Sequence, residues 1–155
     1  QVGQSMRSSQ HVPFAGFKMQ PNDLTSAVGL ANLATLPEAL AAQRAHAATY
    51  DGAFRGSAVR PLRRRSGSSC WLYSVRVKHG PTFIRRLGEL GIEASQTHTR
   101  NDVQPIFAAS RTYLPNMGIL EQELVCLPGG PHLPAEDVQH IAATALAVVK
   151  EEGWT

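Results

Sequence analysis

The sequence predicts an α/β fold in which long N-terminal helices precede a small sheet of about three strands packed with helices. Helical patterns fill the first 56 residues, whereas short runs rich in β-branched and aromatic residues alternate with helical patterns from residue 70 onwards. A length of 155 residues with 43% apolar residues is enough for one ordinary core. We therefore divide the chain into a helical segment, residues 1–56, and a small α/β domain, residues 57–155.

The first predicted helix, residues 24–36, is unusually apolar. Its sequence LTSAVGLANLATL carries no charge on any face, and it follows Asn22 and Asp23, which are good N-cap residues. A helix that is apolar all round is normally covered on several sides, and a domain of this size has little to cover it with. We therefore expect a partner domain or subunit to pack against this helix.

A second helix is predicted from Pro37 to about Phe54, because proline suits the first turn of a helix. The next residues, 57–69, are predicted to be a connector. Its basic cluster lies in a Ser/Gly-rich run without interleaved aromatic residues, which favours a solvated loop over the alternative, a nucleic-acid site. The cluster comprises Arg60, Arg63, Arg64 and Arg65.

The second part of the chain alternates strands and helices. The run WLYSVRV at residues 71–77 predicts a strand, with Trp71 and Tyr73 as core or interface aromatic residues. The pattern then predicts a helix ended by Gly91, a strand over 92–97, a polar loop over 98–104, a helix over 115–124, a strand over 125–127 and a helix from Pro134 to Gly153.

Composition excludes several classes of protein. The longest charge-free helical stretch, residues 24–37, is too short to cross a membrane. Cys70, Cys126 and the histidines lack metal-ligand spacing, so we predict no metal site and a reducing, cytoplasmic environment. The chain begins with Gln and a polar run that has no signal-peptide character, and we expect it to be one piece of a larger protein.

Two polar features are candidates for ligand binding. Lys18 precedes the N-cap of the first helix, where a positive charge and free backbone N–H groups can bind a phosphate or carboxylate. The segment HTRND at residues 98–102 follows a predicted strand end, where ligand sites gather in α/β layers. The alternatives are an ordinary surface lysine and a solvated turn.

Several motifs, in their order and spacing, suggest a known family. GFKMQPND at residues 16–23 precedes the Ala-rich helix, and WLYSVRV, GIEASQTHTRND at 91–102 and LPAEDV at 133–138 follow it. Together they resemble the C-terminal part of the DegT/StrS-type nucleotide-sugar aminotransferases, fold-type-I enzymes that use pyridoxal 5′-phosphate (PLP). The match extends over residues 14–149, nearly the whole chain.

The resemblance implies a homodimeric enzyme that transfers an amino group from a donor such as glutamate to a nucleotide-linked keto-sugar. It also implies that the lysine bound to the cofactor lies in a large N-terminal domain, because Lys18, Lys78 and Lys150 do not stand in the family's context for that lysine. We therefore expect no catalytic residue in this chain and no transamination by the chain alone.

The same resemblance implies the site residues. Lys18 and Asn22 are expected to bind the cofactor phosphate in the neighbouring subunit, and His98, Arg100 and Asn101 are expected to contact the nucleotide-sugar. Two alternatives stay open: a non-catalytic remnant or accessory module that pairs with another chain through the apolar helix, and a related PLP-dependent sugar dehydratase.

Overall fold

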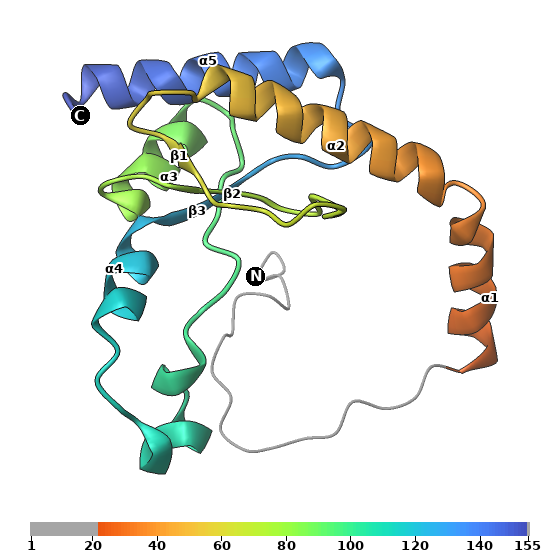
Figure 1. Ribbon diagram of the computed structural model, residues 1–155, viewed down its shortest axis with the longest axis horizontal. Coiled ribbons are helices and arrows are strands. Elements are labelled where there is room, and N and C mark those ends of the chain that lie inside the picture. The colour runs from red at the N-terminus through yellow and green to blue at the C-terminus, as the bar shows by residue number, and fades with distance from the viewer. Residues whose placement is uncertain (1–21, 155) are drawn as a thin grey trace, which may run out of the picture.

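The computed structural model describes residues 22–154 (Figure 1). Its elements are α1 (Asp23–Leu33), α2 (Leu36–Ala53), β1 (Arg60–Pro61), β2 (Tyr73–Arg76), α3 (Gly80–Glu89), the 3-10 turns η1 (Asn101–Val103) and η2 (Pro105–Ser110), α4 (Pro115–Glu123), β3 (Leu124–Leu127) and α5 (Ala135–Glu151). Long helices followed by a small three-stranded sheet are the architecture that the sequence predicts, and the α/β fold is confirmed.

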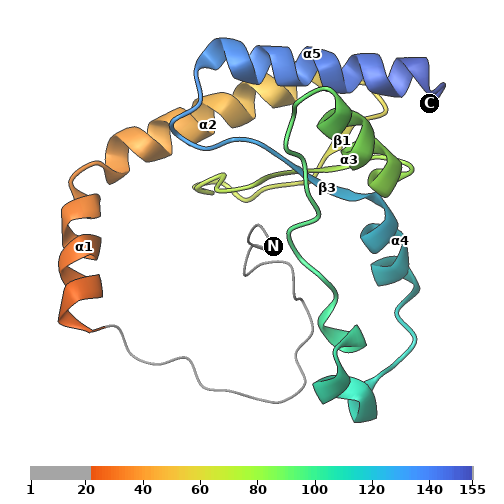
Figure 2. The same ribbon diagram turned by 180° about the vertical axis from the view of Figure 1, so that it is seen from behind.

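The sheet is antiparallel with strand order β1-β2-β3. Tyr73 pairs with Leu127 and Val75 with Val125, so that alternate residues of β2 and β3 share one buried face. Helices α2 and α5 lie side by side on one side of the sheet in both views, and α3 packs against α5 (Figures 1 and 2). Within residues 22–154, no helix combines the length and apolarity that a membrane span requires.

One expected strand is wrong. Residues 92–97 form only a single bridge, in which Ser95 and Cys126 exchange backbone hydrogen bonds of 3.1 and 2.7 Å. The chain does not extend into a strand because the N–H groups of Ile92 and Ala94 are used in turns, donating to the carbonyls of Leu87 and Ile92. The third strand is instead β1, which lies in the expected connector and continues into a bond from the Leu62 N–H to the Ser74 carbonyl (3.0 Å).

The core lies between the sheet and the helices, and α2 reaches into it. Tyr50 of α2 is fully buried, with its ring centroid 4.5 Å from that of Tyr73, and its hydroxyl donates to the Pro128 carbonyl (2.7 Å). Helix α5 contributes the apolar stripe that the sequence predicts: Val138, Ile141, Ala142, Ala145, Val148 and Val149. Burying a valine or isoleucine side chain fully stabilises the fold by about 1.5–3 kcal/mol.

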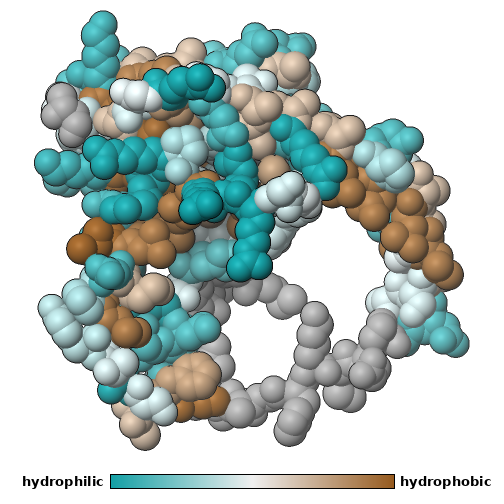
Figure 3. Space-filling view, viewed as in Figure 1, coloured by the Kyte–Doolittle hydropathy of each residue, from teal (hydrophilic) through white to brown (hydrophobic). Residues whose placement is uncertain are grey.

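Helix α1, in contrast, has no buried residue. Leu24 is 74% exposed and Leu30 is 70% exposed, although both are large apolar side chains. Hydrophobic atoms gather over the end of α1 and the start of α2 (Figure 3). An exposed apolar helix of this kind marks an interaction surface, so the expected partner for α1 stays a prediction.

A polar cluster fixes the connector to α2 and makes Arg64 an exception to the expected solvated loop, since Arg60, Arg63 and Arg65 are exposed. The Arg64 guanidinium pairs with the Asp51 carboxylate and lies 5.0 Å from the centre of the Tyr73 ring. The Tyr73 hydroxyl donates to Asp51 Oδ1 (2.8 Å). Burial, together with this bond to the Asp51 carboxylate, raises the pKa of Tyr73. Arg64 is therefore a structural residue.

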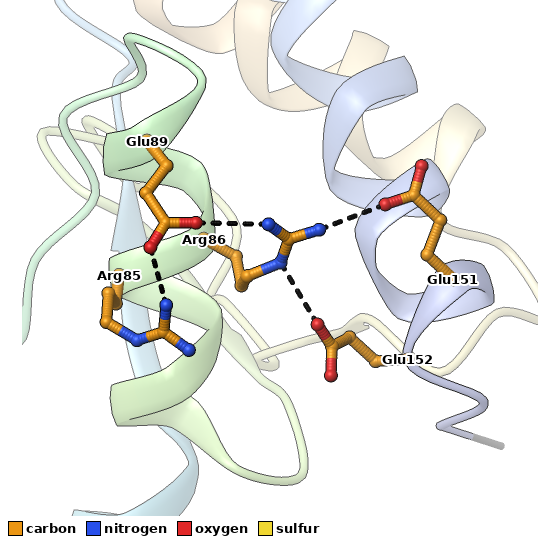
Figure 4. A network of polar contacts seen from close by, with 5 residues as sticks. All are labelled: Arg85, Arg86, Glu89, Glu151 and Glu152. Atoms are coloured by element: carbon orange, nitrogen blue, oxygen red, sulfur yellow. Dashed lines mark hydrogen bonds and ion pairs between the residues drawn. The ribbon is translucent and has the colours of Figure 1, made fainter.

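A five-residue network joins α3 to the end of α5 (Figure 4). Arg86 donates to Glu89 (3.0 Å) on its own helix, and to Glu151 (3.1 Å) and Glu152 (3.0 Å) at the end of α5. Arg85 also pairs with Glu89. The bonds from Arg86 and then from Arg85 lower the pKa of the Glu89 carboxyl.

Replacing Arg64 should destabilise the protein. We expect Arg64→Ala to lower the free energy of unfolding by about 1–2 kcal/mol, because the Asp51 carboxylate loses its charged hydrogen-bond partner and the Tyr73 ring loses the cation above it. Urea unfolding followed by circular dichroism measures the loss. Arg65→Ala is the matched control, since Arg65 is exposed and its side chain makes no hydrogen bond within residues 22–154. Equal stabilities of the two variants would contradict the structural role of Arg64.

The Arg86 network should make stability depend on pH in the acid range. Because the folded-state pKa of Glu89 is lowered, its contribution is fully present above the ordinary value of 4.5 and is lost as the pH falls through the lowered pKa. We expect Arg86→Gln to reduce this acid-dependent loss, measured by thermal unfolding at pH values above and below 4.5. An unchanged pH slope in the variant would show that the network does not act through Glu89.

Candidate functional site

The segment after Ser95 follows an irregular path that side chains tie to α4. Gln96 donates to the Glu121 carbonyl (2.6 Å), and the Arg100 guanidinium lies 3.6 Å from the Glu121 carboxylate. Arg111 returns to the same loop and donates to the carbonyls of Asp102 (3.1 Å) and Val103 (3.0 Å). These contacts hold residues 98–111 beside α4 with short 3-10 turns and little regular structure.

Arg100 is engaged within this loop. Its Nε donates to the Asp102 carboxylate (2.9 Å), and its side chain is only 17% exposed. The bond from Arg100 lowers the pKa of Asp102. The positive charge of Arg100 is thus balanced by Asp102 and Glu121, and the residue shapes the loop. Its expected contact with a substrate stays a prediction.

His98 and Asn101 are both exposed. The His98 ring lies 6.5 Å from the Trp71 ring, centroid to centroid, at an angle of 57°. His98 also lines a hollow of about 360 Å³ together with residues of the segment 62–74. Asn101 begins η1, and its backbone carbonyl accepts from the Gln104 N–H (3.1 Å). The structure thus brings the three residues of the 98–101 segment to one loop.

Asn22 lies elsewhere, as the N-cap of α1. Its Oδ1 accepts from the Thr25 N–H (2.9 Å), and its carbonyl accepts from the Thr25 hydroxyl (2.9 Å) and the Ser26 N–H (2.9 Å). Helix α1 stands apart from the 98–111 loop in both views (Figures 1 and 2). The structure does not bring Asn22 together with His98, and Lys18 lies outside the described residues.

The described residues do not fit a complete PLP site. A lysine that binds PLP covalently needs a desolvated position beside the ring, but both lysines in this part of the chain, Lys78 and Lys150, are exposed. Lys78 stands near Arg60, Arg76 and Glu123 around a small groove, away from His98. The described part also contains no group of three His, Cys, Asp or Glu residues that would hold a metal ion.

Trp71, expected to be a core or interface aromatic residue, lies at the surface and not in the core. Alternation along 71–77 puts Trp71 on the same buried face as Tyr73, yet Trp71 is 59% exposed while Tyr73 is buried. The alternation fails because β2 begins only at Tyr73, and Cys70 has a left-handed backbone with φ of 55°. A Ser/Gly run directly before the strand was the available signal of such a turn.

Comparisons with known proteins identify the class. The family model of the DegT/DnrJ/EryC1/StrS aminotransferase family matches residues 1–146. The structure of the sugar aminotransferase CalS13 from Micromonospora echinospora is 32% identical, with a TM-score of 0.78 over 85% of this chain and 37% of its own. AtS13 from Actinomadura melliaura is 34% identical, with a TM-score of 0.77 over 94% of this chain and 40% of its own. A search of the curated proteins gave no match.

A more distant structure shares the fold alone. Spr1654 from Streptococcus pneumoniae has been solved in a PMP-form and in a PLP-form. The PMP-form is 23% identical, with a TM-score of 0.76 over 84% of this chain and 35% of its own. The family match and the identity to AtS13 show that this chain belongs to the DegT/DnrJ/EryC1/StrS aminotransferase family. The chain spans well under half of the length of these solved relatives.

Arg100 should control the order of the 98–111 loop. We expect Arg100→Ala to speed amide hydrogen exchange in residues 98–111, because the loop loses its bonds to Asp102 and Glu121, and to leave exchange in α5 unchanged. Mass spectrometry of peptides from both regions measures the difference. Arg63→Ala is the control, since Arg63 is exposed and forms no ion pair within residues 22–154. Unchanged protection in the Arg100 variant would contradict this role.

Proposed function

We propose that this chain forms the C-terminal part of a PLP-dependent aminotransferase that acts on nucleotide-linked keto-sugars. The observation that carries the proposal is the family match over residues 1–146. The shared fold with CalS13, itself a sugar aminotransferase, supports the substrate class. The complete enzyme would take its amino group from a donor such as glutamate and would act as a homodimer.

The proposed domains have separate tasks. Residues 57–155 form the small α/β domain, and residues 1–56 form a helical segment that bridges to a large domain and to the dimer interface. The burial pattern supports this bridge: Tyr50, near the end of α2, is fully buried in the small-domain core, whereas Leu24, at the start of α1, is exposed. Polypeptide beyond this chain would cover α1.

The chain's own residues would border the active site. Lys18 and Asn22 are proposed to reach the cofactor phosphate of the neighbouring subunit, where a cation and the start of α1 favour an anion. His98 and Asn101 are proposed to offer a ring nitrogen and an amide to the nucleotide-sugar. Arg100 would hold their loop in place through Asp102 and Glu121.

The central test compares this chain with the product of its complete gene. We expect the complete protein to transfer an amino group from glutamate to a nucleotide-linked keto-sugar, and the 155-residue chain alone to show no transfer. Mass spectrometry of the sugar product measures both reactions. Turnover by the isolated chain would overturn the proposal. Water loss from the sugar without amino transfer would identify the dehydratase alternative.

Lys18 can be tested in the same protein. We expect Lys18→Ala to weaken PLP binding by about tenfold, because a phosphate contact loses its charge. Absorbance titration of the cofactor measures the affinity. Lys150→Ala is the control, as Lys150 is exposed at the end of α5. Equal affinities in the two variants would remove Lys18 from the cofactor site.

The exposed α1 also suits the alternative of an accessory module that pairs with a separate chain. A complete gene product limited to these residues, with a partner polypeptide bound at Leu24 and Leu30, would favour that alternative. Size-exclusion chromatography of Leu24→Asp and of the unaltered protein distinguishes the two, because an apolar interface does not tolerate a buried charge.

A further inference from the structure

We infer that a pocket at the end of α5, the α5 pocket, binds a small carboxylate that carries an apolar body. The pocket lies between the last turns of α5 and the chain that leaves α2, and its volume of about 550 Å³ is within the range of small-molecule sites. It stands apart from the loop at residues 98–111, and the inference does not depend on the proposed function. Its lining includes Ala58, Arg60, Leu146, Val149, Lys150 and Trp154.

The floor of the α5 pocket is apolar and belongs to the core. Val149 is buried, and Ala58 and Leu146 are half-buried side chains that pack against the core cluster. Because the fold holds these residues, the floor exists before a ligand arrives, and an apolar group can be buried on it without reordering the chain. The pocket is therefore suited to the hydrocarbon part of a ligand.

An indole ring forms one wall of the α5 pocket. The Trp154 ring lies 5.3 Å from the His79 ring and 6.3 Å from the Phe83 ring, centroid to centroid. The Trp154 backbone N–H donates to the Val149 carbonyl (2.9 Å), after Gly153 has turned the chain with a left-handed φ of 67°. The ring is thus fixed against α3, and it offers a rigid apolar surface to a ligand.

Two positive side chains line the same pocket without a carboxylate partner. Neither Arg60 nor Lys150 forms an ion pair within residues 22–154, and both are exposed. The two carboxylates that follow Lys150 in the sequence are bound elsewhere, because Glu151 (3.1 Å) and Glu152 (3.0 Å) accept from Arg86 on α3 (Figure 4). No carboxylate among the described residues lines the pocket. An anion that enters it would therefore meet uncompensated positive charge.

The register of the sheet adds a reason for an anion at Arg60. Arg60 pairs with Arg76 across β1 and β2, which brings their Cβ atoms to roughly 5 Å, and like charges directly opposite each other destabilise a sheet. Arg76 is neutralised by Glu123, which accepts from its Nε (2.8 Å) and its Nη2 (2.6 Å). A carboxylate in the α5 pocket would do the same for Arg60, since two parallel N–H groups of a guanidinium match the two carboxylate oxygens.

The end of α5 would by itself disfavour an anion, since the last carbonyls of a helix carry partial negative charge. Here these carbonyls are occupied: those of Val149 and Lys150 accept from the N–H groups of Trp154 (2.9 Å) and Gly153 (3.2 Å). The side chain of Lys150 in the last turn also opposes the helix dipole. The two cations thus determine the sign of the charge that the pocket prefers.

The experiment uses the product of the complete gene and measures the Kd of three probes by ligand-observed NMR titration: octanoate, acetate and n-octylammonium. Octanoate has the head and the body of the proposed ligand, acetate has the head alone, and n-octylammonium has the same body with the opposite charge. We expect octanoate to bind at least tenfold more tightly than either of the others, because only octanoate uses the floor and the cations together. Equal binding of octanoate and n-octylammonium, or no binding of octanoate, would overturn the inference.

Charge variants test the two cations. Arg60→Gln and Lys150→Gln should each raise the Kd of octanoate by about threefold, as expected for an exposed charge, and should not weaken n-octylammonium. The double variant Arg60→Glu/Lys150→Glu should bind n-octylammonium more tightly than octanoate. Arg65→Gln and Lys78→Gln are the matched controls, since both residues are exposed and lie outside the α5 pocket. Losses of equal size in the controls would indicate diffuse surface charge and would overturn the site.

The wall is tested separately. Trp154→Ala should raise the Kd of octanoate by about tenfold and leave that of acetate unchanged, because only the apolar body contacts the indole. Tyr113→Ala is the matched control, since Tyr113 is 86% exposed and lies outside the pocket. Thermal unfolding checks the folding of every variant, and the exposed positions of Arg60 and Lys150 keep the charge variants informative if Trp154→Ala unfolds. Unchanged octanoate affinity in these variants would remove the ligand from this pocket.

The result is distinguishable from a failure of the proposed function. Amino transfer by the complete protein without octanoate binding overturns this inference and leaves the proposed function standing. Octanoate binding with the expected variant effects, in a protein that transfers no amino group, supports the α5 pocket and overturns the proposed function.

Discussion

The packing of Tyr50 against Tyr73 is the constraint on which the other features depend. Tyr50 comes from α2 and Tyr73 from β2, and their ring centroids lie 4.5 Å apart with both side chains buried. The Tyr50 hydroxyl also donates to Pro128, just after β3. One side chain thus joins the helical segment to two strands, and the direction in which α2 leaves the core decides where α1 stands.

That direction explains why α1 is exposed while α2 is half buried. A helix of 18 residues is about 27 Å long, so α2 can bury its last turns in the core and carry its start beyond the sheet. Among the described residues 22–154, α1 packs chiefly against α2, and none of its own residues is buried. The apolar composition of α1 and its exposure within residues 22–154 together support the proposed bridge, in which further polypeptide would cover this surface.

The same core positions the loops of the candidate site. Arg44 reaches from α2 to the turn before Trp71, and Gln96 and Arg100 tie the next loop to α4. Neither loop has regular structure, but each is held by side chains that start from a helix or return to one. Binding residues on loops gain their precision from such a scaffold.

The sequence predicts those elements whose own residues carry a clear local pattern. Helix α5 follows from its apolar period and α2 from its first-turn proline, because local pattern and burial agree. The strand expected over 92–97 fails since its alternation is also satisfied by turns that return to Leu87, and only contact with β3 decides between them. β1 has two residues and no pattern of its own, so it becomes a strand only by pairing with β2.

The features of the candidate site also fall into those that the local sequence predicts and those that depend on long-range contacts. The cluster at 98–102 is visible as a local concentration of polar groups, but the pairing of Arg100 with Glu121 needs the packing of α4. In the sequence, Trp71 fits the alternation of buried residues along 71–77. The turn at Cys70 directs its side chain to the surface instead. Long-range contacts therefore decide which polar side chains are structural and which are open to a ligand.

The basic cluster of residues 60–65 shows how strongly the fold redistributes a local pattern. Arg60 stands in β1 directly opposite Arg76, a like-charge pair that is eased because Arg76 is bound to Glu123 at 2.8 Å. Arg64 turns to Asp51 and Tyr73, whereas Arg63 stays on the rim of the hollow. Neighbours in sequence thus point to three different environments. A run that was expected to form a solvated loop thus contains one arginine in a strand, one bound to Asp51 beside the core, and one exposed at the rim of the hollow.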